Sequence, residues 1–344
     1  MKAIPVLIIS GFLGSGKTTL LLRLVQEAQK RGLQPAVLMN ELGQMDIDGL
    51  ILKDSLQDFT LEKLLDGCIC CDKKSEVSAS IQQLIERSPD LIIIELTGVA
   101  NPEEIADCLT DTMLINRVSL KQIVTILDAE LVLDYNSIFA SDRTLVHTLR
   151  RQMEVADVLL LNKIDLVSAS RLEKIEKAIR KQNTSAPIVR TTHSQMNMDR
   201  LLNDVSPNPN QENRRSNPFP VVRSQPKSVH EQQPSHVHSS PSGNQNRSYS
   251  RLVTLTLPCK DPGNTKLVEG FIKSNSPKLL RAKGYLKLHG NDPRAYLVQL
   301  AGNRIGWLPT TYTGDNYLVL IGLELDSERI RADWERLLHL TVNS

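Results

Sequence analysis

The sequence lacks several features that would assign it to a particular class of protein. No apolar run approaches the roughly 18 to 20 residues of a membrane-spanning helix, so no membrane segment is expected. The 41 basic and 39 acidic residues form no dominant block, and the net charge of +2 gives no electrostatic reason to expect nucleic acid as a partner. The five cysteines are odd in number and largely clustered, which does not fit a disulfide framework. We therefore expect a protein of the reducing cytoplasm.

Short apolar segments rich in Val, Ile and Leu alternate with segments of helical periodicity in the first 205 residues. The predicted strands are 5–10, 35–40, 91–95, 122–128, 157–162 and 187–192, and the predicted helices are 18–30, 76–87 and 170–182. The segment at 5–10 has no cleavage site after it, so it is predicted to be a buried strand and not a signal peptide. The alternation predicts an α/β fold with a mostly parallel, doubly wound sheet.

The composition changes at residues 206–250, which contain seven prolines and almost no aliphatic residues. Such a segment has too little apolar surface to fold, so it is predicted to be a disordered linker. Beyond it, residues 251–344 are predicted to form a small α+β domain, with strands at 251–257, 285–289, 295–300 and 317–324 and helices at 264–274 and 327–340. The predicted domains are therefore 1–205 and 251–344.

The stretch GFLGSGKT, residues 11–18, matches the phosphate-binding P-loop pattern between a strand and an amphipathic helix. Glycines let successive backbone N–H groups point at phosphate oxygens, and the helix N-terminus favours negative charge. Lys17 is expected to contact the β and γ phosphates and Thr18 to bind Mg²⁺. The alternative is a glycine-rich turn that binds nothing. The expected phosphate-site residues are Gly11, Gly14, Ser15, Gly16, Lys17, Thr18 and Thr19.

The stretch NKID, Asn162 to Asp165 with Lys163 between them, follows a predicted strand and matches the guanine signature N-K-x-D. The Asp165 carboxylate can accept two hydrogen bonds from guanine, whereas adenine would leave this acceptor unpaired. An unpaired charged group costs roughly 1–3 kcal/mol or more, which predicts at least a tenfold to hundredfold preference for GTP over ATP. A four-residue match by chance is the alternative.

Two further segments follow predicted strands near the P-loop. Glu95 ends the strand of DLIIIELTG, where many GTPases carry the Asp that holds Mg²⁺ through water, and Gly98 is positioned to offer an N–H group to the γ phosphate. The alternative is a buried strand with a capping Glu. Residues 37–49 carry acidic side chains after a strand and are candidates for a switch segment that responds to the γ phosphate. The alternative is a solvated acidic loop. We assign catalytic roles to Lys17, Thr18 and Glu95; no catalytic Gln or Arg is evident, so intrinsic hydrolysis should be slow.

Three cysteines, Cys68, Cys70 and Cys71, stand within four positions. Their thiolates can converge on one ion, but a closed structural zinc site normally needs two separated C-x₂-C pairs. We therefore expect an open site whose fourth position is filled by Glu41, water or a partner. Soft sulfur ligands select Zn²⁺, Co²⁺, Ni²⁺ or Cu⁺, and a helix beginning near Ser75 favours the thiolate form. The alternatives are inert, half-buried cysteines or a redox pair.

The motifs GFLGSGKTT, NELG, DGCICC, ELTG and NKID, in this order, resemble the CobW-like family of metal-handling P-loop GTPases. Residues 279–288 and 318–322 also resemble the carboxy-terminal domain of that family, so the resemblance covers nearly the whole chain. It implies a GTP-hydrolysing metallochaperone or metal insertase that holds Zn²⁺ or Co²⁺ and delivers it to a client metalloprotein. The resemblance implies that the transferred metal is bound by Glu41, Cys68, Cys70 and Cys71. It also implies that the guanine base is bound by Asn162 and Asp165.

The sequence departs from that family at two places. Gln44 stands where relatives commonly carry Glu, which removes a second carboxylate ligand. The predicted linker carries His230, His236 and His238, which suit either metal capture or ordinary linker composition.

Contact with the γ phosphate is expected to order residues 40–49 and present Glu41 to the thiolates, which would raise metal affinity in the GTP state. A nucleotide-regulated protein-binding module with structural cysteines is the main alternative, and an ATP-dependent kinase or synthetase is a third. The sequence leaves open the physiological metal, the client and the oligomeric state, a homodimer included.

Overall fold

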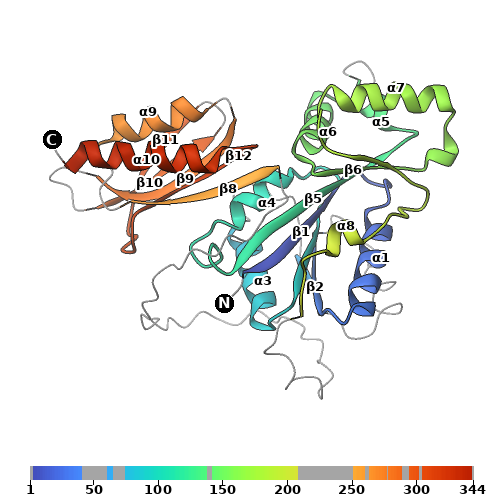
Figure 1. The fold of residues 1–344 in the computed structure, drawn as a ribbon, viewed down its shortest axis with the longest axis horizontal. Coiled ribbons are helices and arrows are strands. Elements are labelled where there is room, and N and C mark those ends of the chain that lie inside the picture. The colour runs from blue at the N-terminus through green and yellow to red at the C-terminus, as the bar shows by residue number, and fades with distance from the viewer. Residues whose placement is uncertain are drawn as a thin grey trace.

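The structure of the protein is a computed structural model that describes residues 3–40, 60–64, 74–137, 142–207, 251–259, 263–276, 278–288, 294–301 and 304–342. Figure 1 shows an α/β unit followed by an α+β unit. The first unit contains, in chain order, β1 (Ile4–Ser10), α1 (Lys17–Lys30), β2 (Pro35–Asn40), β3 (Thr60–Leu64), α3 (Lys74–Glu86), β4 (Leu91–Glu95), α4 (Pro102–Cys108), β5 (Val118–Asp128), α5 (Val132–Tyr135), α6 (Arg143–Val155), β6 (Val158–Asn162), the 3₁₀ turn η1 (Ile164–Leu166), α7 (Ala169–Arg180), β7 (Ile188–Arg190) and α8 (Asp199–Leu202).

The seven described strands of the first unit form one sheet in the order β3-β2-β4-β1-β5-β6-β7, and every neighbouring pair is parallel. Strand β4 is buried along its whole length, as is β6, because both faces of the sheet are covered. In a parallel sheet all strands point the same way, so the loops that follow β1, β4 and β6 meet at one edge. The predicted fold class is confirmed.

Helices cover both faces of this sheet. On one face, α1 and α8 pack on β1 and β4 through Leu20, Leu24 and Leu201, which share a buried cluster with Leu7 and Ile9. The opposite face is covered by two groups of helices, α3 with α4 and α6 with α7, whose buried leucines and isoleucines contact alternate residues of the same strands. The strands are therefore apolar on both sides, which is why they occur in the sequence as short continuous apolar runs.

The second unit contains β8 (Leu252–Pro258), α9 (Thr265–Asn275), β9 (Leu279–Lys287), β10 (Ala295–Ala301), β11 (Arg304–Thr310), β12 (Tyr317–Leu323) and α10 (Ser327–Val342). Its strands form an antiparallel sheet in the order β11-β10-β9-β12-β8. Helices α9 and α10 cover one face, where the rings of Phe271 and Trp334 lie 4.8 Å apart between centroids. The other face meets the first unit, since Leu252, Val319 and Ile321 belong to the same buried cluster as α3 and α4.

Several elements differ from the sequence predictions. Strand β5 begins at Val118 and not at residue 122, because residues 118–120 pair with β1. Lys121, which interrupts the apolar pattern, donates a hydrogen bond to the carbonyl oxygen of Asn203 at 2.6 Å. Strand β9 spans 279–287 and not 285–289, because Arg281 and Lys283 alternate with the buried residues that face α9 and α10. The sequence patterns do not predict β3, α4, α5, α6, η1, α8 or β11.

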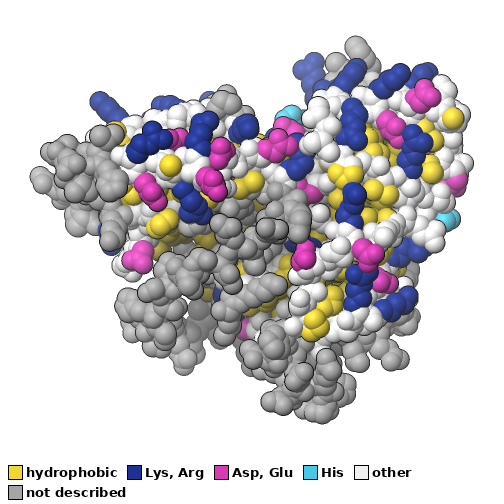
Figure 2. Space-filling model, viewed as in Figure 1, with side chains coloured by type: hydrophobic (Ala, Val, Ile, Leu, Met, Phe, Trp, Pro, Cys, Tyr) yellow, Lys and Arg dark blue, Asp and Glu magenta, His cyan; other side chains and the backbone are white. Residues whose placement is uncertain are grey.

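Two sequence expectations are addressed only in part by the structure. Of the segment predicted to be a linker, residues 208–250 lie outside the described residues. Of the described helices, none combines the length and the apolar content that crossing a bilayer requires. Figure 2 shows Lys and Arg side chains interspersed with Asp and Glu on the face in view, with no block of one sign.

Candidate nucleotide site

The P-loop connects β1 to α1 at the carboxyl edge of the central sheet, and two of its glycines are required by their surroundings. Gly11 has φ +133°, and a Cβ there would lie 2.2 Å from the carbonyl oxygen of Ile126. Gly16 has φ +109°, and a Cβ there would lie 2.5 Å from Nδ2 of Asn162. Both positions therefore exclude any side chain, and the loop curls tightly against β5 and β6.

Lys17 is the first residue of α1 and is buried, with 7% of its surface exposed. Its Nζ donates a hydrogen bond of 3.1 Å to the carbonyl oxygen of Phe12 within the same loop. The ammonium group thus lies inside the curve of the loop, where a phosphate oxygen would compete with that carbonyl for it. The hydroxyl of Ser15 is also buried there, with no hydrogen-bond partner among the described residues.

Thr18 and Glu95 bring two oxygen ligands together at the ends of β1 and β4. The Thr18 hydroxyl donates to Oε1 of Glu95 at 3.0 Å, and Glu95 is only 7% exposed. Nearby in sequence, the Thr97 hydroxyl is buried and no described residue pairs with it. Mg²⁺ takes hard oxygen ligands and usually binds through one or two protein oxygens, water and substrate phosphates. A hydroxyl and a carboxylate at the mouth of a phosphate loop fit that ion.

Gly98 lies directly against the P-loop. A Cβ on Gly98 would be 2.8 Å from the backbone nitrogen of Leu13, so only glycine fits between the two loops. The carbonyl oxygen of Gly98 accepts a hydrogen bond of 3.2 Å from Nε2 of the fully buried Gln152 on α6. The segment after β4 therefore lies beside the phosphate loop.

Asn162 ends β6 and ties three loops together. Its Nδ2 donates to the carbonyl oxygen of Ser15 at 2.8 Å and to the Ser194 hydroxyl at 3.2 Å. Its Oδ1 accepts hydrogen bonds from the Thr191 hydroxyl at 3.0 Å and from the Ser194 backbone N–H at 2.9 Å. Both ends of the amide are therefore bonded to protein groups, and Asn162 holds the P-loop against the segment that follows β7.

The rest of the NKID segment is arranged differently from Asn162. Lys163 has a left-handed backbone, with φ +60°, and its Nζ lies 2.6 Å from Oδ2 of the buried Asp128. Asp165 lies in η1, is exposed, and makes no hydrogen bond to another described residue. An exposed carboxylate without a hydrogen bond to another described residue is suited to accept hydrogen bonds from a ligand.

Sequence reasoning missed four residues that build this site: Asp128, Gln152, Thr191 and Ser194. The segment TTHSQ, residues 191–195, gave a usable signal, since small polar residues occur at the end of the predicted strand 187–192, at the edge where ligands bind. Asp128 gave the same signal, since it ends the predicted strand 122–128, whereas Gln152 gave none. Gln152 lies on a helix whose partner, the segment after β4, is far away in the sequence.

The predicted metal ligands Glu41, Cys68, Cys70 and Cys71 lie outside the described residues, as do Gln44 and the histidines of the predicted linker. Within the described ranges, no three His, Cys, Asp or Glu side chains are grouped so that they could hold a metal ion. The metal site therefore stays a prediction from the sequence.

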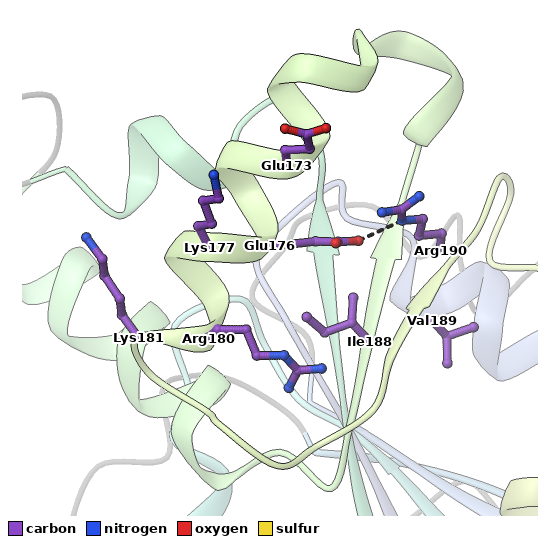
Figure 3. A pocket seen from close by; sticks show the side chains of 8 residues that line it. All are labelled: Glu173, Glu176, Lys177, Arg180, Lys181, Ile188, Val189 and Arg190. Carbon is purple, nitrogen blue, oxygen red and sulfur yellow. Dashed lines mark hydrogen bonds and ion pairs between the residues drawn. The ribbon is translucent and has the colours of Figure 1, made fainter.

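A groove of about 1180 Å³ lies between α7 and the edge strand β7. Figure 3 shows Glu176 of α7 directed at Arg190 of β7, and their Oε1 and Nε atoms are 2.6 Å apart. The hydrogen bond from Arg190 lowers the pKa of Glu176. The groove includes none of the P-loop or NKID residues, so it is separate from the nucleotide site.

Models of protein families identify both units of the chain. The nucleotide-binding domain of CobW, HypB and UreG matches residues 5–190. The chain belongs to the CobW/HypB/UreG family of P-loop GTPases. The C-terminal domain of the cobalamin synthesis protein CobW matches residues 252–338, which agrees with the position of the antiparallel sheet.

Curated relatives from this family are similar to the chain over different lengths. The zinc chaperone YjiA of Escherichia coli is 28% identical over 96% of this chain and 98% of its own. The zinc-regulated GTPase metalloprotein activator 1 of Saccharomyces cerevisiae is 28% identical over 99% of this chain and 84% of its own. The protein of the same name from Dictyostelium discoideum is 31% identical, and the match spans 48% of its length.

Among solved structures, the crystal structure of the Zn(II)-bound YjiA GTPase from E. coli is similar to this chain with a TM-score of 0.46. The two are 21% identical over 98% of this chain and 99% of the other.

Proposed function

We propose that this protein is a GTP-hydrolysing metallochaperone, which binds Zn²⁺ as cargo and couples its delivery to a client metalloprotein to the nucleotide state. The observation that carries the proposal is the arrangement at the sheet edge, where Lys17 and Thr18 of the P-loop lie beside Glu95 of β4 and Asn162 of the NKID segment bonds to Ser15 of the same loop. The names of the relatives, zinc chaperone and GTPase metalloprotein activator, support the metal part of the proposal.

In the proposed reaction the chain's own groups bind and orient the triphosphate. The backbone N–H groups of residues 11–18 surround the phosphates, and Lys17 exchanges the carbonyl oxygen of Phe12 for phosphate oxygens. Thr18 and Glu95 would hold Mg²⁺, which when bound neutralises charge on the β and γ phosphates. Gly98 offers its N–H to the γ phosphate from the neighbouring loop. Since no Gln or Arg is assigned to orient the attacking water, the unassisted rate should be slow.

The base is read by Asp165, with Asn162 and Lys163 holding the loop that carries it. Both ends of the Asn162 amide are bonded to protein, and Lys163 is paired with Asp128. These two side chains therefore hold the loop that carries Asp165 in place. The exposed Asp165 carboxylate is then available to accept two hydrogen bonds from guanine, donors that adenine does not offer in that arrangement. We expect about a tenfold to hundredfold preference for GTP over ATP.

For the cargo, we propose that the thiolates of Cys68, Cys70 and Cys71 bind the ion together with Glu41, in an open site that exchanges metal. Zn²⁺ is favoured over Co²⁺ for sulfur ligands by its place in the affinity order of divalent metals. The segment that carries Glu41 directly follows β2, which lies beside β4 in the sheet and ends at the same edge as the P-loop.

We further propose the domain division 1–205, 206–250 and 251–344.

The test measures Zn²⁺ affinity with GDP and with a non-hydrolysable GTP analogue bound. The proposal expects tighter binding with the analogue, since a ligand shifts an equilibrium only if it binds the two states differently. Cys70→Ser should weaken Zn²⁺ binding and remove metal-dependent stimulation of GTP hydrolysis.

The matched control is Cys108→Ser, which removes a buried thiol of α4 outside the C-x-C-C segment and should leave Zn²⁺ affinity unchanged. Equal Zn²⁺ affinity in the two nucleotide states would end the coupling proposal. If Cys70→Ser and Cys108→Ser changed Zn²⁺ affinity equally, the assignment of the metal site to the C-x-C-C segment would be wrong.

A further inference from the structure

Helix α4 lies between the central parallel sheet and the C-terminal sheet (Figure 1). It has seven residues, begins at Pro102, and is joined to the end of β4 by the short segment 96–101, which contains Gly98. The segment is held at its start because Glu95 pairs with Thr18 of the P-loop. With one end fixed and so few residues, the position of α4 determines where Gly98 lies relative to the phosphate loop.

The nucleotide domain holds α4 from one side, through neighbouring residues of α6. Gln152, which is fully buried, donates from Nε2 to the carbonyl oxygens of Gly98 at 3.2 Å and Ala100 at 3.0 Å. Its neighbour Arg151 donates from Nε to Oε1 of Glu103, the second residue of α4, at 2.7 Å. Glu103 is 5% exposed, so this ion pair is shielded from water. These contacts fix the helix against α6.

The C-terminal domain holds α4 from the other side. Nη2 of Arg281, on β9, lies 3.3 Å from Oε1 of Glu104, and Nη1 lies 4.0 Å from Oδ2 of Asp107. The side chains of Arg281 and Glu104 are 25% and 24% exposed, so the pair is largely shielded. Next to it, Ile105 of α4 and Val319 of β12 belong to one buried cluster. Arg281 therefore spans the two carboxylates that α4 presents to the sheet, next to an apolar contact.

We infer that Arg281 is a positioning residue for the nucleotide reaction, contributed by the second domain. By holding Glu104 and Asp107 it keeps α4 in place, and with α4 it keeps Gly98 beside the P-loop, where its N–H meets the γ phosphate. The inference rests on the proposed function. Because GDP lacks the group that Gly98 contacts, the contribution of Arg281 applies to the triphosphate alone. Coupling of this kind is reciprocal, so binding of GTP strengthens the contact between α4 and the C-terminal sheet.

The test compares the affinities for a non-hydrolysable GTP analogue and for GDP, measured with fluorescent nucleotides on the full chain. Arg281→Ala is expected to weaken binding of the GTP analogue about two- to fivefold, the effect of losing its ion pairs with Glu104 and Asp107, and to leave GDP affinity unchanged. Arg281→Lys keeps the charge and should restore part of the loss. A change in the ratio of the two affinities is a readout that a purely structural role would not give.

The matched control is Arg251→Ala. Arg251 also lies at the domain boundary, where Nη1 donates to the carbonyl oxygen of Glu154 and Nε pairs with Glu324, but it does not contact α4 through these bonds. It should leave the affinity ratio unchanged. If Arg281→Ala does not fold, Glu104→Gln removes the same ion pair from the α4 side and should lower the ratio in the same direction.

The inference is overturned if Arg281→Ala and Glu104→Gln weaken both nucleotides equally, or if Arg251→Ala changes the ratio as much as they do. These outcomes are separate from the proposed function, because binding is measured without turnover. A wild-type chain that binds the GTP analogue but hydrolyses no GTP would refute the proposed activity and leave this inference open to the same binding comparison.

Discussion

The NKID segment allows a prediction in which two residues of one motif behave in opposite ways. Asn162, which is 3% exposed, makes four hydrogen bonds of 2.8–3.2 Å with Ser15, Thr191 and Ser194. At roughly 1 kcal/mol for each bond, Asn162→Ala should lower the free energy of unfolding by about 3 to 4 kcal/mol. For a domain of this size this corresponds to a fall of about 6 to 16 °C in melting temperature.

Asp165→Ala supplies the matched comparison. Asp165 is exposed and bonds to no other described residue, so its removal should leave the melting temperature nearly unchanged. It should instead reduce the preference for GTP over ATP from about tenfold or a hundredfold to near unity, because the guanine donors lose their acceptor. Asn162→Ala, by contrast, should weaken both nucleotides, since it releases the P-loop at Ser15.

The assay combines thermal and urea unfolding, followed by circular dichroism, with competition between GTP and ATP for a fluorescent nucleotide. The slope of the unfolding free energy against urea should be the same for all three proteins, so that midpoints report stability. The reasoning fails if Asn162→Ala costs less than about 1 kcal/mol, or if Asp165→Ala lowers the melting temperature as much as Asn162→Ala does.

Two other predictions concern the P-loop and acid stability. Gly16→Ala should abolish binding of both GTP and GDP in fluorescence titrations, because its Cβ would lie 2.5 Å from Asn162 Nδ2 at a backbone φ of +109°; unchanged binding would show that the loop can relax. The hydrogen bond from Arg251 holds the pKa of Glu324 below its ordinary value of 4.5, so its stabilising contribution is present above that pH and is lost as the pH falls through the lowered pKa. The difference in stability between wild type and Glu324→Gln, from urea midpoints at several pH values, should therefore shrink with acidification, and a constant difference would contradict this.

Local patterns in the sequence were sufficient for the central sheet. Strands 35–40 and 91–95 were predicted with the bounds that β2 and β4 have, because strands covered on both faces are continuous apolar runs. The predictions failed where one face of a strand is polar. In β9 the charged residue Arg281 faces α4 and Ala282 faces the C-terminal helices, so the alternation is visible only when both partners of the sheet are known.

The sequence by itself determined the phosphate and base motifs, because each requires particular residue types at a fixed local spacing after a strand. Only the tertiary structure decided how those motifs divide their work: that Asn162 holds Ser15 and Ser194 while Asp165 stays exposed, and that Gln152 reaches Gly98. It also decided that Arg281 meets α4. Those contacts join residues distant in the sequence through single polar atoms, and such pairings leave no periodicity in the chain from which they can be read.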